Sequence, residues 1–366
     1  MNKCALYIPR PGDKYDAICS GYVDTLRHLG WKTYVCDPRT KFGCRELIEK
    51  HNITLIMTHS RYGVRQLPVD TINDNNVVVF VEVLPINSGD LSIDGPYEVS
   101  HQEEPRILSS IKSCVVHTSI EKHLWLSYMS GWCNSGFSLR HVPVAGNLLK
   151  ATPPTCDTVT DVAMVANFSH RQNVMAKIVE PLFSRLTMLN HPYQAFGDEI
   201  WHFAGLQYNG PLANKDNILA HIYASANVCP NVHTEHQVTQ QAYLNGRSFM
   251  IPLCGGTQVS DNPLAKKYLL SSCRVATSIT DFISQVVDLA SGESFNRQKI
   301  EDSVKHVAEN HTYFNRLAVL FDAANLGGFS EETKNEGHRA AIKHCWTIGA
   351  MLSAKERGVK YEQTNV

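Results

Sequence analysis

Glu82 is the second-to-last residue of the most apolar run of the sequence, Val77–Val83 (VVVFVEV), which is followed directly by a Leu-Pro pair. A carboxylate at the end of a buried strand can take a proton from an acceptor hydroxyl and so act as a general base. His59 follows another apolar run, Thr54–Thr58, and is the second candidate for that role. The alternative for Glu82 is a buried carboxylate that is paired with a nearby arginine and takes no part in chemistry.

A second group of polar residues is typical of phosphate binding. Ser169 and Arg171 follow the apolar run Val162–Ala166 and precede a helical pattern that starts at Gln172. The first amides of a helix and an arginine fork can together hold a diphosphate. The loop after the first apolar run of the chain, with Gly12, is the corresponding candidate in the other half. The simpler alternative is that Ser169 only caps the helix.

The segment from His233 to His236 (HTEH) combines two imidazoles with Glu235. Hydrogen bonds to sugar hydroxyls are the first interpretation, and a solvated loop is the second. A metal site comes third because the spacing departs from the H-E-x-x-H pattern of zinc enzymes. No D-x-D triplet occurs either. We therefore predict no metal and no other required cofactor.

Alternating strands and helices must position these residues. In the first half the patterns predict helices at Ala17–Leu29 and Cys44–His51. Strands that are apolar throughout are typical of a parallel sheet covered on both faces, and their alternation with helices predicts a doubly wound α/β domain. The strands predicted in this half are Cys4–Ile8, Thr33–Cys36, Thr54–Thr58, Val77–Val83, Cys114–His117 and Arg140–Val144.

A Pro- and Thr-rich linker at residues 151–159 precedes a second series of the same kind. Its predicted strands are Val162–Ala166, Gln194–Gly197, Ala226–Val232, Phe249–Pro252 and Arg274–Thr277. Its predicted helices are Gln172–Leu189, Asp281–Leu289 and Arg297–Glu309. We expect an α/β protein of two doubly wound Rossmann-like domains, residues 1–150 and 160–322, that face a central cleft. The tail, residues 323–366, is expected to be flexible as far as a helix from about His338 to Arg357, which packs back on the N-terminal domain.

Composition narrows the function classes. The 366 residues carry a net charge of −1, which excludes a globally basic nucleic-acid binder but permits a local basic surface. The 11 cysteines include no C-x-x-C pair, as expected of thiols kept reduced in the cytoplasm. No apolar run is long enough to span a membrane. The sequence also lacks G-x-G-x-x-G and the P-loop pattern, which argues against dinucleotide-dependent and P-loop chemistry.

Several segments of the second half follow one another in a familiar order. They are VAMVANFSHRQ, YQAFGDE, YNGPLANKDNILAHIYASANVCPNV, QVTQQAYLNGRSFMIP and HTYFNRLAVLF. This order, over about residues 160–320, resembles the donor-binding half of GT-B glycosyltransferases, in particular the CgeB-like group. It is also similar to the phage β-glucosyltransferases that modify hydroxymethylcytosine in DNA. The resemblance implies transfer of a hexose from a nucleotide diphosphate sugar, with a UDP-sugar favoured, to an acceptor hydroxyl.

The resemblance assigns roles to individual residues. The segment 238–246 would be the helix facing the ribose, and the family's acidic residue, five positions before the glycine, is replaced here by Gln241. This departure keeps a catalytically degenerate nucleotide-sugar binding protein as an alternative, with sugar-nucleotide epimerisation as a weaker third. The implied diphosphate contacts are Ser169 and Arg171, and the implied nucleoside and sugar contacts are Gly210, Leu212, His233, Glu235, Gln240 and Gln241.

The acceptor should be bound by the first domain, where Arg39, Arg61 and Arg65 follow predicted strands. A basic rim of this kind suits a polyanion, although a solvated face with ordinary ion pairs is an equally simple interpretation. One specific acceptor is a hydroxymethylated pyrimidine in phage duplex DNA, whose base must be extruded from the stack. The alternative acceptor is a glycan or a cell-surface polymer. The expected location is the cytoplasm of a bacterium or of a phage-infected host cell.

Overall fold

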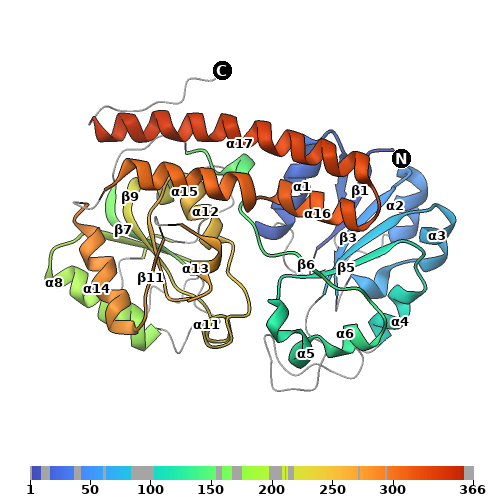
Figure 1. Ribbon diagram of the computed structural model, residues 1–366, viewed down its shortest axis with the longest axis horizontal. Coiled ribbons are helices and arrows are strands. Elements are labelled where there is room, and N and C mark those ends of the chain that lie inside the picture. The colour runs from blue at the N-terminus through green and yellow to red at the C-terminus, as the bar shows by residue number, and fades with distance from the viewer. Residues whose placement is uncertain are drawn as a thin grey trace. The chain divides into compact units, whose positions relative to one another are not determined.

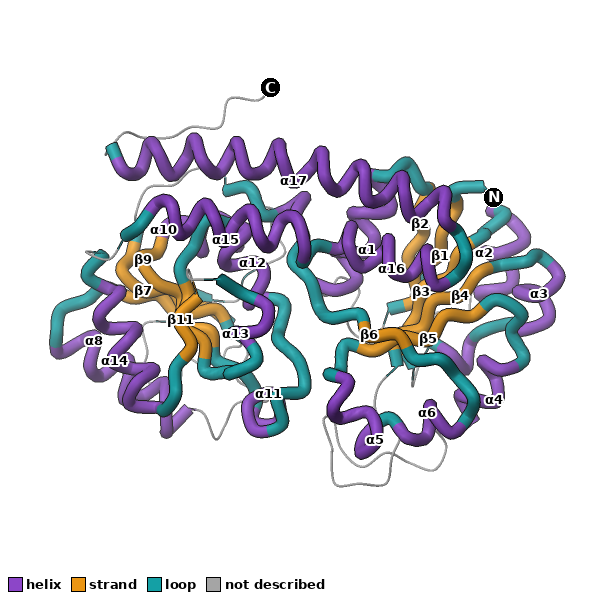
Figure 2. The backbone as a smooth tube through the Cα atoms, in the orientation of Figure 1, coloured by secondary structure: helices purple, strands orange, loops and turns teal. Residues whose placement is uncertain are grey.

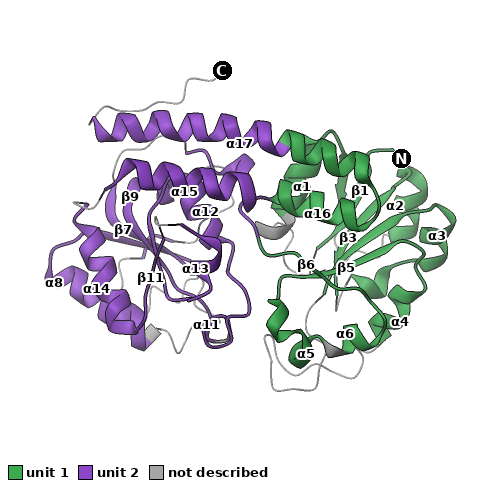
Figure 3. Cartoon of the chain, viewed as in Figure 1, with its two compact units in different colours: residues 1–144, 313–336 green, residues 145–312, 337–366 purple. Residues whose placement is uncertain are grey.

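The computed structural model describes residues 2–9, 17–36, 43–60, 63–83, 103–153, 159–166, 175–197, 208–210, 212, 218–270, 273–292 and 295–357. The chain forms two compact units, which Figure 3 shows in different colours. Unit 1 comprises residues 1–144 and 313–336, and unit 2 comprises residues 145–312 and 337–366.

The sheet of unit 1 is parallel throughout and has the strand order β2-β1-β3-β4-β5-β6 (Figure 1). Every residue of β1, β3 and β4 is buried, because helices cover both faces of a doubly wound sheet. The strands are β1 (Cys4–Ile8), β2 (Lys32–Val35), β3 (Leu55–His59), β4 (Val78–Glu82), β5 (Cys114–Thr118) and β6 (Arg140–His141).

The helices of unit 1 come from both ends of the chain. Early segments supply α1 (Ala17–His28), α2 (Cys44–His51), η1 (Val64–Gln66), α3 (Val69–Asp74), α4 (Glu103–Ser109), η3 (Lys122–Leu124), α5 (Trp125–Tyr128) and α6 (Ser130–Asn134). The late segments are α16 (Tyr313–Ala323) and the first part of α17 (Gly327–Glu356).

The late segment of unit 1 completes its core. The Phe321 ring of α16 lies 5.8 Å from the ring of Phe80 on β4 and 5.8 Å from that of Trp31. Phe329 packs on Trp31 at 5.2 Å, and Ser330 is fully buried. The prediction of a flexible stretch after Phe321 is therefore wrong, because apolar anchors hold this segment despite its paired glycines and many charges.

The sheet of unit 2 is also parallel, with the order β11-β10-β9-β7-β8 (Figure 2). Its strands are β7 (Thr160–Val165), β8 (Tyr193–Phe196), β9 (Ala226–Asn231), β10 (Gln258–Ser260) and β11 (Cys273–Val275). The remaining elements of this unit are η4 (Leu148–Lys150), the π-helical turn η5 (Met175–Val179), α8 (Glu180–Met188), α10 (Ile218–Ser225), α11 (Glu235–Thr239), α12 (Arg247–Leu253), α13 (Ala265–Tyr268), α14 (Ile279–Ala290) and α15 (Arg297–Asn310).

One predicted strand of unit 2 is a helix. Residues Phe249–Pro252 belong to α12, and the strand of this region, β10, comes after it. All residues from Ser248 to Leu253 are buried, and a short run that is apolar on every side shows no periodicity that separates a strand from a helix.

The C-terminal helix contributes to both units. Its later part packs within unit 2, where Ile348, Met351 and Leu352 share a core cluster with Ala224, Ile300 and Val304. The prediction that this part packs on the N-terminal domain is therefore wrong, because its apolar residues bury against α10 and α15. No helix within the described ranges has the length and apolar character needed to cross a membrane.

Candidate functional site

Unit 1 carries a row of polar side chains at the carboxyl ends of its central strands. His59 of β3 is the register partner of Glu82 of β4, which is itself the partner of His117 of β5. Paired positions of neighbouring parallel strands point to the same face of a sheet, so the three side chains lie side by side. Tyr7 of β1 extends the row, since it pairs with Met57, two residues before His59.

Two contacts hold this row together. The Tyr7 hydroxyl lies 2.7 Å from Nε2 of His59, and Nδ1 of His59 lies 3.2 Å from Oε2 of Glu82. The imidazole thus lies between a phenol, with which it shares a hydrogen bond, and a carboxylate, which is near Nδ1 but has no hydrogen bond with it. Tyr7 and His59 are almost fully buried, whereas Glu82 keeps 9% of its surface exposed.

Burial determines the charge state of His117. It lowers the pKa of this imidazole to about 4, although the negative charge of Glu82 acts in the opposite direction. Its Nδ1 has no hydrogen-bond partner within the described ranges. Burial also raises the pKa of Tyr22 on α1, and the charge of Glu82 adds to that effect. Two of the groups that interact with Glu82, the His117 imidazole and the Tyr22 hydroxyl, are therefore neutral near pH 7.

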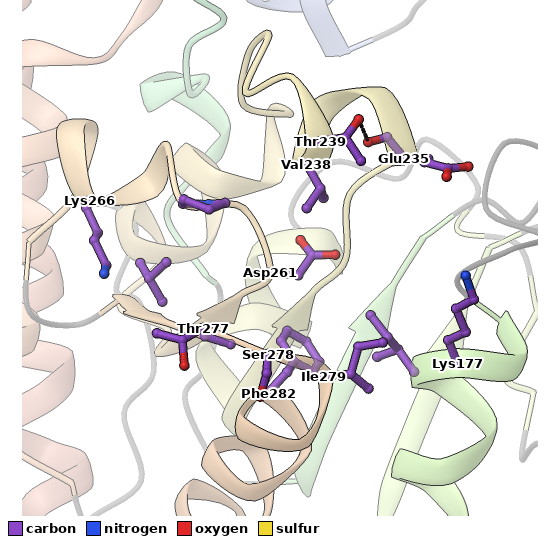
Figure 4. A pocket seen from close by; sticks show the side chains of 14 residues that line it. Lys177, Glu235, Val238, Thr239, Asp261, Lys266, Thr277, Ser278, Ile279 and Phe282 are labelled. Carbon is purple, nitrogen blue, oxygen red and sulfur yellow. Dashed lines mark hydrogen bonds between the residues drawn. The ribbon is translucent and has the colours of Figure 1, made fainter.

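Unit 2 offers an open cavity of about 540 Å³ at the carboxyl ends of β10 and β11. This volume is within the range of small-molecule sites. Part of its wall is apolar, with Ile178, Val275 and Phe282 among the lining residues. Figure 4 shows its charged side chains projecting from different elements; they are Lys177, Glu235, Asp261 and Lys266.

A series of hydrogen bonds runs from Ser248 through His233 to Asp261 at this cavity. The backbone amide of His233, just after β9, donates to both carboxylate oxygens of Asp261 at 3.1 Å. Nδ1 of His233 lies 2.6 Å from Oδ1 of Asp261, and its Nε2 lies 3.3 Å from the hydroxyl of Ser248. Because Ser248 is fully buried, this series orients the carboxylate of Asp261 and does not present a serine nucleophile.

Buried amide side chains form hydrogen bonds with Ser248, the first member of this series of hydrogen bonds. Nδ2 of Asn231 donates to the hydroxyl of Ser248 at 2.9 Å and to Oε1 of Gln258 at 3.0 Å. Nδ2 of Asn245 donates to Oδ1 of Asn231 at 3.0 Å, and Nε2 of Gln258 donates to the carbonyl of Ser248 at 2.8 Å. A buried network whose members satisfy one another is rigid, so the floor beneath the cavity is preorganised.

The structure brings some of the predicted site residues together and leaves others apart. Glu82 and His59 are in contact, and His233 lies behind the cavity that Glu235 lines. Gly210 and Leu212 follow β8, while Gln240 and Gln241 follow α11; none of the four is among the residues lining the cavity. Arg65 is exposed in η1. The other predicted contacts lie outside the described residues; they are Gly12, Arg39, Arg61, Ser169 and Arg171.

The helix predicted at residues 238–246 is wrong. Helix α11 ends at Thr239, and the next helix, α12, begins only at Arg247. Gly246 caps the start of α12, whereas Gly255, with φ of +76°, follows its end and turns the chain toward β10. The acid of the resembled family lies five positions before a glycine. If that glycine is Gly255 and not Gly246, the position is Met250, which is not an acid either.

Sequence reasoning missed several residues of these two sites. His117 ends a correctly predicted strand, and the strand-end signal that selected Glu82 and His59 would have selected it too. Asp261 follows β10, a strand of only 3 residues that leaves no recognisable apolar run. Lys177 and Lys266 reach the cavity from separate elements and carry no local signal.

Metal ligands are a separate question. Among the residues that the structure describes, no group of three or more His, Cys, Asp and Glu side chains is placed to hold a metal ion.

Comparisons with known proteins concern the fold and one part of the sequence. Residues 171–322 match the model of a family described as glycosyl transferase-like. No curated protein matches the sequence. Sucrose-phosphate synthase from Thermosynechococcus elongatus has a similar structure, with a TM-score of 0.58 and 12% identity over 88% of this chain and 98% of that one.

Two further structures come from sugar-transferring enzymes. The T4 phage enzyme BGT, in complex with its UDP-glucose substrate, matches with a TM-score of 0.54 and 10% identity over 92% of this chain and 99% of its own. The DNA-modifying enzyme beta-glucosyltransferase matches with a TM-score of 0.51 and 11% identity over 93% and 99%. The chain therefore has the GT-B fold, and its residues 171–322 are a glycosyl transferase-like segment.

Proposed function

We propose that this protein is a glycosyltransferase that moves a hexose from a nucleotide diphosphate sugar, with a UDP-sugar favoured, to an acceptor hydroxyl. The observation that carries the proposal is the cavity of unit 2, which lies at the carboxyl edge of its sheet and within the glycosyl transferase-like segment. Ligands of open parallel sheets bind at that edge. The similar T4 phage enzyme is described with UDP-glucose as its substrate.

The donor is bound by unit 2 in this proposal. Lys177, exposed at the cavity, adds positive charge for the diphosphate. Arginine and helix amides stabilise the leaving diphosphate in place of a metal ion. The proposed contacts of this unit are Ser169 and Arg171 for the diphosphate, Gly210 and Leu212 for the nucleobase, and Glu235, Gln240 and Gln241 for the ribose and sugar. The His233 side chain is fully buried, so it is not proposed as a direct contact.

Glu82 is the proposed general base. The acceptor oxygen attacks the anomeric carbon and loses its proton to the carboxylate, while the bond between that carbon and the diphosphate oxygen breaks. His59, 3.2 Å away and hydrogen-bonded to Tyr7, is positioned to take the proton onward or to replace Glu82 as base.

The proposed acceptor is a hydroxymethylated pyrimidine in duplex DNA. Arg65, exposed in η1, together with Arg39 and Arg61, would contact the phosphates. One similar structure belongs to a DNA-modifying enzyme and another to a sucrose-phosphate synthase, so a glycan or a cell-surface polymer is kept as the alternative acceptor.

Two measurements test the proposal. Thermal stabilisation by UDP-glucose, compared with GDP- and other UDP-sugars, reports donor binding. Release of UDP is then followed with hydroxymethylated duplex DNA, unmodified duplex DNA or an oligosaccharide as acceptor. Transfer only to the hydroxymethylated duplex, weakened by salt, is the expected result. Transfer to the oligosaccharide alone would move the acceptor to the glycan class.

A catalytically degenerate binding protein is the second candidate. It is favoured by the missing acid, since neither Gln241 nor Met250 supplies a carboxylate. Binding of a nucleotide sugar without hydrolysis or transfer under any of these conditions would establish it and refute the enzyme.

A further inference from the structure

Asp261 is the carboxylate that the fold holds most firmly at the cavity of unit 2. It follows β10, keeps 9% of its side chain exposed, and lies in Figure 4 between the lysines at positions 177 and 266. His233 fixes its orientation through the backbone amide and the imidazole, and Ser248 supports the far side of that ring. The direction of the carboxylate is therefore set before any ligand binds.

The two oxygens of this carboxylate are used unequally. Oδ1 accepts from both the amide and Nδ1 of His233, whereas Oδ2 shares only the amide, counted over the residues that the structure describes. An ionised carboxylate offers about four acceptor sites, so Oδ2 retains capacity for further donors. Sugar hydroxyl groups can donate to it, and hydrogen bonds to a charged acceptor are about twice as strong as those between neutral groups.

A purely structural role explains this arrangement less well. Asp261 lies beside an open cavity, whereas the amide side chains that stabilise the same region, Asn231 and Gln258, are fully buried. The network also contains the buried guanidinium of Arg247, which donates to the carbonyl of Val232 and to Oδ1 of Asn231 and interacts with the charge of Asp261. That interaction accounts neither for the position of Asp261 at an open cavity nor for the remaining acceptor capacity of its Oδ2.

We propose that Asp261 binds, through Oδ2, either the 2′,3′-hydroxyl pair of the donor's ribose or the 2,3-hydroxyl pair of its hexose, and that His233 is the positioning residue for this contact. The inference rests on the proposed function. It assigns to Asp261 the role of the sugar-binding acid, which neither α11 nor α12 supplies. Hydroxyls of both sugars offer the same chemistry, so the test must separate them.

Calorimetric affinities of the full chain supply that test. The ligands are UDP-glucose, its analogue lacking the ribose 2′-hydroxyl, and its analogue lacking the hexose 2-hydroxyl. The proteins are the wild type, Asp261→Asn and a charge-matched control, Asp288→Asn, which changes an exposed carboxylate of α14. Melting temperatures confirm that each variant is folded.

The wild type and Asp288→Asn should bind one analogue about 10- to 100-fold more weakly than UDP-glucose, as expected for loss of a hydrogen bond to a charged group. Asp261→Asn should bind UDP-glucose about 10- to 100-fold more weakly and no longer distinguish it from that analogue. The sensitive analogue identifies the sugar that Asp261 contacts.

Three results would overturn the inference alone. They are a wild type indifferent to both analogues, an Asp261→Asn variant that binds UDP-glucose normally, and a weakened variant that still discriminates as the wild type does. The first needs no variant and so holds even if Asp261→Asn does not fold. A wild type that binds no nucleotide sugar at all would overturn the proposed function and this inference with it.

Discussion

The carboxyl edges of the two sheets carry different kinds of side chains. In unit 1 the edge is a row of titratable side chains, Tyr7, His59, Glu82 and His117, set into apolar strands. In unit 2 it is an open cavity beside a network of hydrogen-bonded amides, and His233 orients one of its carboxylates, that of Asp261. The same topology thus supports two kinds of edge.

The difference follows from what each edge can do physically. A buried row with a neutral His117 can move protons but has little surface with which to hold a large ligand. A cavity of about 540 Å³ with lysines and a carboxylate can hold a ligand, and its rigid floor lowers the ordering cost of binding. This difference is the reason why we propose proton transfer for unit 1 and donor binding for unit 2.

Replacing Glu82 should have the largest effect. Glu82→Gln keeps the shape but cannot accept a proton, so the transfer rate at saturating donor should fall by about 10²- to 10⁴-fold. The affinity for UDP-glucose should stay within about 2-fold of that of the wild type. Single-turnover kinetics and calorimetry measure the two quantities. Undiminished transfer would remove Glu82 from the mechanism, and a selective loss of affinity would reverse the roles assigned to the two edges.

Replacing Asn231 tests the floor of the cavity. Asn231→Ala leaves Ser248, Gln258 and Asn245 without a shared partner, and unpaired buried polar groups should cost about 2–4 kcal/mol in the free energy of unfolding. Urea denaturation gives this value. The control is Gln298→Ala on the exposed side of α15, which should stay within about 0.5 kcal/mol. A loss no greater than that of the control would show that the amide network does not stabilise unit 2.

Acid should destabilise both units through one buried histidine each. Burial lowers the pKa of His117 in unit 1, and of His344 in unit 2, to about 4. An unfolded histidine titrates near pH 6.5, so between about pH 6.5 and pH 4 the unfolded chain binds more protons than the folded chain. The free energy of unfolding therefore decreases as the pH is lowered through this range. His117→Gln or His344→Gln should reduce this dependence by up to about 1.4 kcal/mol per pH unit.

Unfolding free energies measured at intervals from pH 7 to pH 4.5 give the slopes. The two substitutions lie in different units and should reduce the slope additively. A slope that neither variant changes would contradict the burial of these imidazoles.

A substitution outside both edges sets the baseline. Trp346 on α17 is 78% exposed, so Trp346→Ser should alter the unfolding free energy by less than about 0.5 kcal/mol and leave the affinity for UDP-glucose unchanged. Denaturant titration and calorimetry measure both. A larger loss of stability would mean that the indole is covered by another molecule in solution.

The local sequence was sufficient for the central strands of unit 1, and it selected two residues that the fold brings together. Continuous apolar runs located β1, β3, β4 and β5 to within a residue or two, and the alternation with helices predicted the doubly wound class. Polar residues at the ends of two such runs identified Glu82 and His59, because parallel strands place their carboxyl ends at one edge.

Tertiary structure alone decided the rest. The register that sets His117 beside Glu82, and the hydrogen bonds that orient Asp261, join residues far apart in the chain. Helix α12 is buried on every side, and the segment after Phe321 is anchored by the packing of Phe329 on Trp31, so neither has a local pattern that predicts it. Local periodicity records which face of an element is buried, whereas the choice of partner depends on packing between distant segments.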